Sequence, residues 1–510
     1  MKFTIRKRVF IPAFSIVVIA AIIGLINNEL LISFFMKAFE NVYKYLGWLF
    51  QLVILLSVLV VIILSISPKG KILIGGKDAK PKYSTVTWFA MSLTGGLTSG
   101  LVALGVAQPV IFSQNIWGEL TGYGIATGSD EAVMFGMARS LHEWTLAPYA
   151  LYGISGIAIA YMCFNKHKKV SISSSLIPLF GDKICDSEWS SVIDGVSILS
   201  LALATVGTLG SFLSLSTLCL RMVYKVPTSV ILMFILMLVV TCIYLSSSLS
   251  GVDKGIKIFA RINTFFYIFL MIFVFIYSSP KVVITTSSDS IIYWMQKALL
   301  WAVDYGKIGG EALVKWWTVY NWAFWIAYAP VTGVFLAQLS YGRTVREFLL
   351  VNWLAPSVFV GIWFNIFGSI GMEWQRTGIV DIAASINEGG TYAGIWAFLD
   401  NLPLKEIIIP VALFTMLISF TTGADNSITV ISALCVDGKK IGDEAPAILK
   451  CAWGIAIGLL SFLLMAFAAG SKGNDGVRYM VVAVGGILLF LFILQLISVI
   501  KMFFIDKAEE

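Results

Sequence analysis

Long, nearly uncharged apolar runs recur along the whole chain of 510 residues, and they constrain the fold more than any other feature. A helix needs ~20 apolar residues to cross the ~30 Å of hydrocarbon in a bilayer. Because the runs are continuous rather than alternating, they predict helices and not the strands of a membrane barrel. About twelve spans are expected, at residues 9–27, 46–66, 86–113, 140–163, 190–219, 228–249, 257–279, 316–339, 347–371, 404–434, 448–470 and 478–504.

The composition excludes an ordinary soluble protein. Hydrophobic residues make up 58% of the chain and charged residues 13%, which is too little polar surface for a globular protein in water. The net charge of +7 is spread over short loops, so it does not indicate nucleic acid as a partner. The six cysteines lie far apart without a CxxC pair, which predicts free thiols. The expected environment is therefore the lipid bilayer.

The sequence lacks the motifs of an enzyme. His142 and Glu143 are adjacent, but no second histidine follows at the spacing that a zinc ion needs. No glycine-rich loop ending in Gly-Lys-Ser/Thr occurs in the sequence, so ATP is not the expected energy source. We therefore expect neither an enzyme nor a bound cofactor or metal.

Lysine and arginine residues predict the orientation in the membrane. They gather in alternate loops, whereas the loop at residues 113–131 carries Glu119, Asp130 and Glu131 and no basic residue. Short loops rich in lysine and arginine stay in the cytoplasm, and an even number of spans places both termini there. The first apolar run shows no cleavage site, so it predicts a helix rather than a signal peptide. The expected location is the inner (cytoplasmic) cell membrane.

Two predicted spans are irregular. Residues 94–100 hold three glycines, and Pro109 follows in the same span; glycine costs a helix interior ~1 kcal/mol and proline ~3 kcal/mol relative to alanine. Small residues at these positions favour either close helix packing or a helix that unwinds at the bilayer midplane and offers carbonyls to a cation. The eighth span contains Pro330. One broken helix in each half would indicate inverted five-helix repeats with a site between them.

The chain is expected to divide around these repeats. Residues 1–85 would form two N-terminal helices outside the repeats, 86–285 the first repeat and 316–510 the second. Between them, 286–315 would hold an amphipathic surface helix at Ser290–Tyr305. A short interfacial helix is expected at Tyr392–Leu402.

Aromatic residues mark the eighth span. On a helix Trp317, Asn321, Phe324 and Tyr328 form one stripe, with Trp325 beside it. Tryptophan at a membrane end is usually an interfacial anchor, and this is one interpretation of Trp317. The other three rings lie two to three turns inside, where a packing seam and a binding site are the two interpretations.

Aromatic residues of the fourth span, Trp144, Tyr149 and Tyr152, could complete a box of ring faces around a cation. Each desolvated cation–π contact contributes ~2 kcal/mol, and micromolar binding needs ~8 kcal/mol. A methylated ammonium suits such a box because it carries no N–H donor that would be left unpaired. The residues therefore favour a quaternary ammonium over a primary amine.

At this point the sequence resembles a known family, the betaine/carnitine/choline transporters, over nearly the whole chain. The residues that carry the resemblance are Trp317-Thr318-Val319, Trp322-Ala323-Phe324-Trp325, the run from Val334 to Glu347, Lys254-Gly255-Ile256-Lys257 and Ala424-Asp425. The resemblance implies an all-α polytopic membrane protein with a leucine-transporter-type fold and two additional N-terminal helices. It also implies a homotrimer.

The resemblance further implies which residues bind substrate. The family's aromatic box corresponds to Trp144, Tyr149, Phe324, Trp325 and Tyr328, and Trp317 corresponds to a second, vestibular position. Several positions depart from the family pattern and leave the specific compound open. Phe324 stands in place of tryptophan, Ala103 and Ile111 in place of aromatic residues, Gln108 in place of glutamate and Glu143 in place of histidine.

The implied function is secondary active transport of a quaternary-ammonium compound, such as betaine, carnitine, γ-butyrobetaine or choline, by alternating access. The alternatives are a sodium-coupled symporter of another small zwitterion or amino acid on the same fold, and a receptor-like or channel-like protein without coupled transport. Family members that sense osmotic stress carry long charged terminal extensions. Since both tails are short here, we expect uptake or exchange for metabolism.

The resemblance leaves the coupling open between sodium symport and substrate exchange. Family sodium symporters hold Na⁺ between third-span carbonyls, corresponding to Thr94 and Leu97, and tenth-span hydroxyls, corresponding to Thr422 and Gly423. Gly423 can offer only its backbone. Sodium-independent exchangers carry an arginine where Asn263 stands here.

Glu143 is a separate hypothesis from the residues themselves. An ionisable group inside a membrane is expensive and is usually functional. Beside Trp144, its carboxylate could attract the cationic head of the substrate or take a proton during coupling. The alternative is that it lies in water at the outer end of its span.

Overall fold

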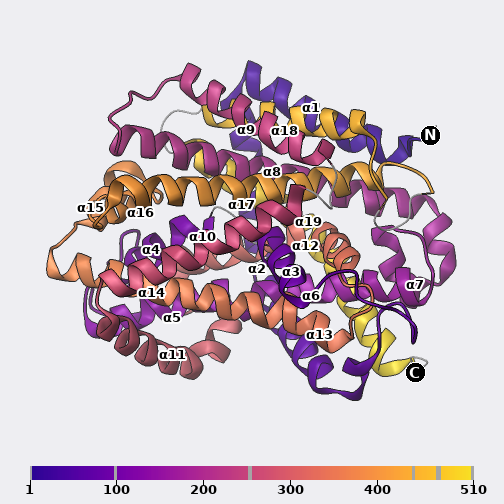
Figure 1. The fold of residues 1–510 in the computed structure, drawn as a ribbon, viewed down its shortest axis with the longest axis horizontal. Helices are drawn as coiled ribbons and strands as arrows, with labels where there is room; N and C mark the ends of the chain where they lie inside the picture. Colours follow the sequence, from indigo (N-terminus) through magenta and orange to yellow (C-terminus); the bar gives the residue numbers. More distant parts are fainter. Residues whose placement is uncertain (1–2, 97–99, 251–254, 439–442, 467–471, 507–510) are drawn as a thin grey trace.

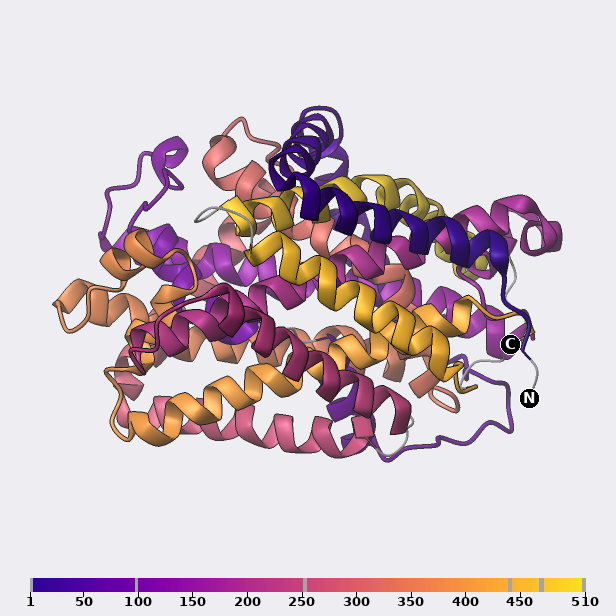
Figure 2. The same cartoon turned by 90° about the horizontal axis from the view of Figure 1, so that it is seen from above.

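The described part of this computed structural model comprises residues 3–96, 100–250, 255–438, 443–466 and 472–506. These residues form a bundle of long helices with two isolated β-bridges and no sheet among them (Figures 1 and 2). Helix α1 begins, and the last segment η8 (Lys501–Ile505) ends, at the end of the bundle that carries the short helix α7 (Ile177–Phe180) (Figure 1). The prediction of an all-α polytopic membrane protein is confirmed.

Eleven helices of the described residues are long and apolar enough to cross a membrane. The elements that build these spans are α1 (Lys7–Ile26), α2 (Asn28–Ile66), α5 (Asp130–Trp144), α6 (Leu146–Ala160), α8 (Glu188–Met222), α9 (Val230–Ser250), α10 (Gly255–Tyr277), α12 (Tyr320–Leu339), α13 (Val345–Leu349), α14 (Ala355–Thr377), α17 (Lys405–Leu434), α18 (Ala447–Ala466) and α19 (Lys472–Ile500). Pi-helical segments extend some of them: η3 (Tyr161–Asn165), η6 (Glu311–Val319) and η7 (Leu350–Leu354).

The third predicted span, residues 86–113, corresponds to two shorter helices, α3 (Thr85–Gly96) and α4 (Gly100–Ser113). Residues 97–99 between them lie outside the described residues. The two helices have different neighbours, since α3 packs against α10 and α17 whereas α4 packs against α14 and α5. The third span therefore joins two separate groups of helices.

The predicted start of the second span and the predicted break in the eighth span are wrong. Neither the charged residues nor the proline ended the helix concerned. Helix α2 begins at Asn28, not at residue 46, because four charged residues interrupt its hydropathy without breaking a helix. The expected break at Pro330 is absent, and α12 runs through this proline. Neighbouring helices satisfy the backbone group that a buried proline frees. The irregular part of this span is instead the π-helical segment η6, where Trp317 lies.

The fourth span is broken where no break was predicted. Thr145 has φ −105° and ψ −111°, outside the helical region, and it separates α5 from α6. The Thr145 hydroxyl donates a hydrogen bond to the carbonyl of Leu141 at 2.6 Å, so this buried hydroxyl has a partner on its own helix. The break lies directly after Trp144, at the end of α5.

The two short amphipathic helices differ from their predictions. The surface helix is α11 (Pro280–Ala302), which is longer than Ser290–Tyr305 and starts before the expected segment 286–315. The expected interfacial helix is α16 (Ala393–Leu399), which packs against α4 and α8 and whose Trp396 and Phe398 are fully buried. Its apolar face is therefore covered by protein and not by the membrane interface. Helix α15 (Ile382–Gly389) packs beside it.

Glycine allows α6 and α12 to pack closely at the centre of the bundle. A Cβ atom on Gly333 would lie 2.8 Å from the backbone carbonyl carbon of Ser155 on α6. Side chains larger than hydrogen are therefore excluded at this crossing. The close contact brings the aromatic residues of α6 and α12 together one to two turns away.

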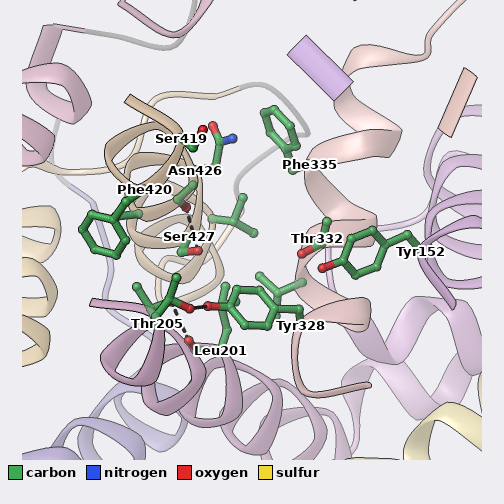
Figure 3. Close-up of a pocket in the computed structure, with 15 residues that line it drawn as sticks. Tyr152, Leu201, Thr205, Tyr328, Thr332, Phe335, Ser419, Phe420, Asn426 and Ser427 are labelled. Atoms are coloured by element: carbon green, nitrogen blue, oxygen red, sulfur yellow. Dashed lines mark hydrogen bonds between the residues drawn. The ribbon is translucent and has the colours of Figure 1, made fainter. Parts of the chain in front are cut away.

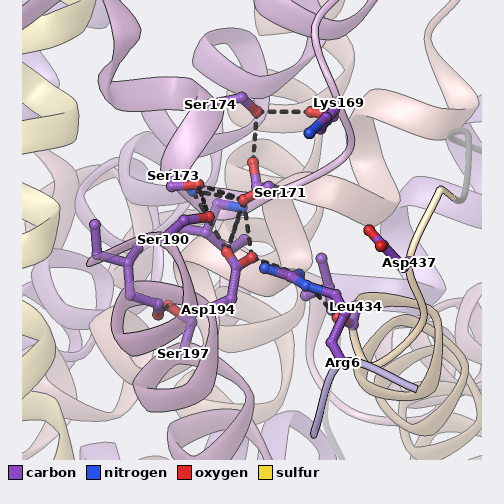
Figure 4. Close-up of polar contacts among 12 residues, drawn as sticks. Arg6, Lys169, Ser171, Ser173, Ser174, Ser190, Asp194, Ser197, Leu434 and Asp437 are labelled. Carbon is purple, nitrogen blue, oxygen red and sulfur yellow. Dashed lines mark hydrogen bonds and ion pairs between the residues drawn. The ribbon is translucent and has the colours of Figure 1, made fainter. Parts of the chain in front are cut away.

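A buried polar cluster fixes the end of the bundle near α1. The Asp194 carboxylate on α8 is fully buried and accepts hydrogen bonds from the Ser171 hydroxyl and the Ile172 N–H. It also forms an ion pair with Arg6 at 2.7 Å, and Arg6 donates to the carbonyl of Leu434 on α17 (Figure 4). The start of the chain is thereby attached to α8 and α17.

Candidate functional site

The predicted aromatic residues of α5, α6 and α12 form one packed cluster with Trp325 at its centre. The Trp325 ring lies 5.2 Å from Tyr149, 5.1 Å from Tyr152 and 6.2 Å from Trp144, centre to centre. Phe324 lies 6.3 Å from Trp325. All of these rings except Phe324, which is partly buried, are buried.

An outer cavity of about 60 Å³ reaches this cluster from one side. Trp144 and Phe324 line it, together with Trp317, which also borders a larger vestibule of about 510 Å³. One water molecule takes up ~10–15 Å³ of such space. The outer cavity is therefore wide enough for a few waters only, while the vestibule has room for a small solute.

An inner cavity of about 30 Å³ lies beyond the cluster. It is lined by Tyr328 and Tyr152, and Figure 3 shows Asn426 and Ser427 of α17 facing Thr332 and Tyr152 across it. The Tyr328 hydroxyl is hydrogen-bonded to Thr208, which borders both the inner and the outer cavity. The predicted box residues thus lie on two sides of a closed constriction.

Tyr149 and Trp325 border neither cavity. Phe324 and Tyr328, one turn apart on α12, are 5.0 Å apart at their ring centres and face the outer and the inner cavity respectively. In this conformation the rings pack on one another instead of enclosing an open box. A substrate at the centre requires these rings to separate.

Glu143 is fully buried in a polar network beside the cluster, so the alternative that it lies in water at the outer end of its span is wrong. Its carboxylate accepts hydrogen bonds from Gln108 and from Thr318, each at 2.8 Å. Arg139, one turn earlier on α5, lies 3.5 Å away and is also fully buried. The Trp144 indole donates to Gln108 at 2.8 Å. The network therefore fixes the orientation of a cluster ring.

Asn321 connects the same network to Trp325. Its amide donates to the backbone carbonyl of Glu143 at 2.6 Å, and its side-chain oxygen accepts from the Trp325 indole at 3.2 Å. Asn321 belongs to the aromatic stripe of the eighth span, but its position in the sequence indicated no role for it. The role of Asn321 depends on contacts between helices, which no local pattern in the sequence marks. Arg139 and Glu143 are four residues apart on one helix, a spacing that the sequence does show.

Four of the residues considered for ion coupling, Thr94, Asn263, Thr422 and Gly423, lie on α3, α10 and α17, which pack against one another. The buried hydroxyl of Thr422 and the buried side-chain oxygen of Asn263 have no hydrogen-bond partner. Gly423 borders the inner cavity, and its carbonyl accepts from Ser427 at 2.8 Å. Leu97 lies outside the described residues, and so does the side chain of Thr94. A hydroxyl and an amide oxygen without partners are atoms of the kind that hard cations take as ligands.

Glu119 of the loop between α4 and α5 lies behind Trp117 and Trp317, which line the vestibule. It is fully buried, and its carboxylate accepts hydrogen bonds from the Trp317 indole at 3.2 Å and from the Trp117 N–H at 2.9 Å. Burial is the largest influence on this group and raises its pKa from 4.5 to about 7. The carboxyl group therefore binds its proton more tightly in the folded protein than in the unfolded chain.

The raised pKa of Glu119 predicts a pH-dependent stability. Its contribution is fully present below pH 4.5 and is lost as pH rises through about 7. Over this rise in pH, the ionisation of Glu119 lowers the free energy of unfolding by up to about 3 kcal/mol. Between pH 5 and 8 we expect the thermal unfolding midpoint of the wild type to decrease relative to that of Glu119→Gln, measured in detergent by tryptophan fluorescence. Parallel pH profiles of the two proteins would contradict the assignment.

The fold and the row of cavities between its helices define a multi-pass membrane transporter. The family model described as BCCT, betaine/carnitine/choline family transporter, matches residues 8–508. The chain therefore belongs to the betaine/carnitine/choline transporter family, as the resemblance predicted, and it is a transporter rather than an enzyme.

Characterised relatives are similar over most of their length. The glycine betaine transporter OpuD of Bacillus subtilis (strain 168) is 29% identical over 465 residues, which cover 90% of this chain and 87% of that protein. A glycine betaine/proline/choline transporter of Vibrio parahaemolyticus is 27% identical over 473 residues, covering 90% and 84%. An ectoine/hydroxyectoine transporter of Virgibacillus pantothenticus is 25% identical over 466 residues, covering 91% and 90%.

Proposed function

We propose that this protein transports glycine betaine or a closely related quaternary-ammonium compound by alternating access, and that the cluster around Trp325 holds the ammonium group. The observation that carries the proposal is a buried group of rings on α5, α6 and α12 with a cavity on either side. A permanent cation that leaves water can be compensated by ring faces without any hydrogen bond. The relatives named for glycine betaine support the same substrate class.

The cavities support a path for the substrate. From the vestibule beside Trp317, the outer cavity leads to Trp144 and Phe324, and the inner cavity continues beyond Tyr328. We propose that the substrate passes the constriction when the rings of Phe324 and Tyr328 separate and the Tyr328–Thr208 hydrogen bond opens. The closed centre corresponds to a state in which neither side has access to the site.

We propose that a Na⁺ ion is carried with the substrate. The orphaned buried oxygens of Thr422 and Asn263 support this choice over exchange, because a buried polar oxygen without a partner is unfavourable unless it binds something. From the family resemblance we further propose two inverted repeats at residues 86–285 and 316–510, cytoplasmic termini and a homotrimer.

The experiment that tests the function is uptake of labelled glycine betaine into proteoliposomes, with and without an inward Na⁺ gradient. We expect accumulation that depends on the gradient and competition by carnitine, γ-butyrobetaine or choline. Unlabelled glycine, which has no methyl groups, serves as the matched control and should not compete.

Each other outcome identifies a rival function. Binding without uptake or counterflow would indicate a receptor. Exchange that ignores Na⁺ would exclude symport, and equal competition by glycine would indicate an amino-acid symporter.

A further inference from the structure

An arginine at the start of α19 stands over the aromatic wall of the vestibule. The guanidinium carbon of Arg478 lies 5.4 Å from the ring centre of Trp317 and 5.2 Å from that of Tyr320. Arg478 borders both the 510 Å³ vestibule and the 60 Å³ cavity that leads to Trp144. It therefore lies at the passage between the two cavities.

The side chain of Arg478 keeps hydrogen-bonding capacity in this position. A guanidinium stacks on rings through its flat face, and its five N–H donors lie in its plane. Arg478 shares one hydrogen bond with the Tyr320 side chain, which leaves further donors for other partners. Asp475, one turn earlier on α19, lines the same vestibule, but in the described part of the chain Arg478 forms no ion pair with a carboxylate. Asp475 attracts Arg478 electrostatically without a salt bridge between them, so the guanidinium beside this half-enclosed cavity is not held by a close carboxylate.

We propose that Arg478 binds the carboxylate of the incoming substrate and makes the transporter select zwitterionic quaternary-ammonium compounds over bare cations, an inference that rests on the proposed function. The planar fork of a guanidinium matches a carboxylate with two parallel hydrogen bonds. With its carboxylate on Arg478, a small betaine directs its ammonium group toward the rings of Trp144 and Phe324, which line the adjoining cavity.

Charge explains the selectivity. A zwitterion is neutral overall and places a negative group on Arg478, while choline brings only a positive charge toward the guanidinium. Like charges in a partly desolvated cavity repel each other, and this raises the free energy of the choline complex. Arg478 therefore discriminates by charge, and the ring cluster discriminates by methylation.

The first test changes the ligand and leaves the protein intact. Glycine betaine and its methyl ester carry the same ammonium group, but the ester has lost the carboxylate charge. Competition against labelled glycine betaine on the reconstituted wild-type protein should show the ester roughly ten- to hundredfold weaker. Equal potency of acid and ester would overturn the proposal.

The second test removes the charge from the protein. For Arg478→Gln we expect glycine betaine affinity to fall roughly ten- to hundredfold, while choline affinity stays equal or improves, so that the preference between the two ligands shifts. Arg478→Lys should retain part of the preference, because it keeps the charge but loses the planar fork. Lys307→Gln is the matched control, since Lys307 is an exposed cation over an exposed ring, that of Tyr305.

The outcomes separate this proposal from the function on which it rests. If Arg478→Gln weakens or strengthens both ligands by the same factor, Arg478 has a packing or plugging role and the proposal fails while the function stands. If the wild type binds neither glycine betaine nor choline, the function fails and the selectivity fails with it. The ester comparison decides the matter even if an Arg478 variant does not fold.

Discussion

Replacing Trp325 with leucine is expected to lower the affinity for every quaternary-ammonium substrate about thirtyfold or more. One desolvated cation–π contact is worth ~2 kcal/mol, which corresponds to about thirtyfold in a dissociation constant. Trp325 contacts Trp144, Tyr149 and Tyr152, so its loss also removes the packing that orients these rings. Binding of labelled glycine betaine to purified protein, followed by uptake into proteoliposomes, measures the effect.

Two further variants make this result interpretable. Trp325→Phe keeps a ring face and should retain most of the affinity, although it loses the hydrogen bond to Asn321. Trp374→Leu removes a tryptophan that packs against Phe398, away from the cluster, and should leave affinity unchanged. If Trp325→Leu binds substrate as tightly as the wild type, the ammonium group is held elsewhere and the proposed site is wrong.

Replacing Glu143 with glutamine is expected to destabilise the protein by about 3–5 kcal/mol, because it leaves the fully buried Arg139 without its carboxylate. The amide would also present an N–H group to one of the two donors, Gln108 and Thr318, that now face the carboxylate. We expect a lower thermal unfolding midpoint in detergent. Because Gln108 holds the Trp144 indole, we also expect weaker substrate binding.

A double variant separates the ion pair from any direct role in binding. Arg139→Met combined with Glu143→Gln removes both charges, and such replacements of a whole buried pair are often neutral or stabilising. Recovery of the unfolding midpoint without recovery of substrate affinity would indicate that Glu143 acts on the site itself. Glu131→Gln on the exposed start of α5 is the matched control and should change neither quantity. Wild-type stability of Glu143→Gln would contradict the importance of the pair.

These two predictions concern connected parts of the molecule. Asn321 binds the backbone of Glu143 with its amide and the indole of Trp325 with its oxygen. Movement of α12 relative to α5 would therefore change both the polar network and the ring cluster. Substrate binding and helix movement can be coupled through this contact, because both depend on the same short set of hydrogen bonds.

Periodicity and composition predicted the parts of the fold that depend on local sequence. The long apolar runs located the membrane helices, and the glycine-rich third span was predicted to be irregular; it corresponds to the separate helices α3 and α4. The predicted start of α2 and the predicted length of α11 were wrong, since charged residues lower hydropathy without ending a helix. Pro330 did not break α12, because helices packed around a proline can satisfy the backbone group that it frees.

The sequence by itself determined the class of this protein, its family and the rings of α5, α6 and α12 that gather in one place. These follow from hydrophobicity and from a dense aromatic motif, which are properties of single segments. Only the tertiary structure decided that Glu143 accepts hydrogen bonds from Gln108 and Thr318, that Thr145 breaks the fourth span and that Arg478 lies over Trp317. Such contacts join residues on different helices or depend on how one helix bends against its neighbours, and this information is not contained in any local run of residues.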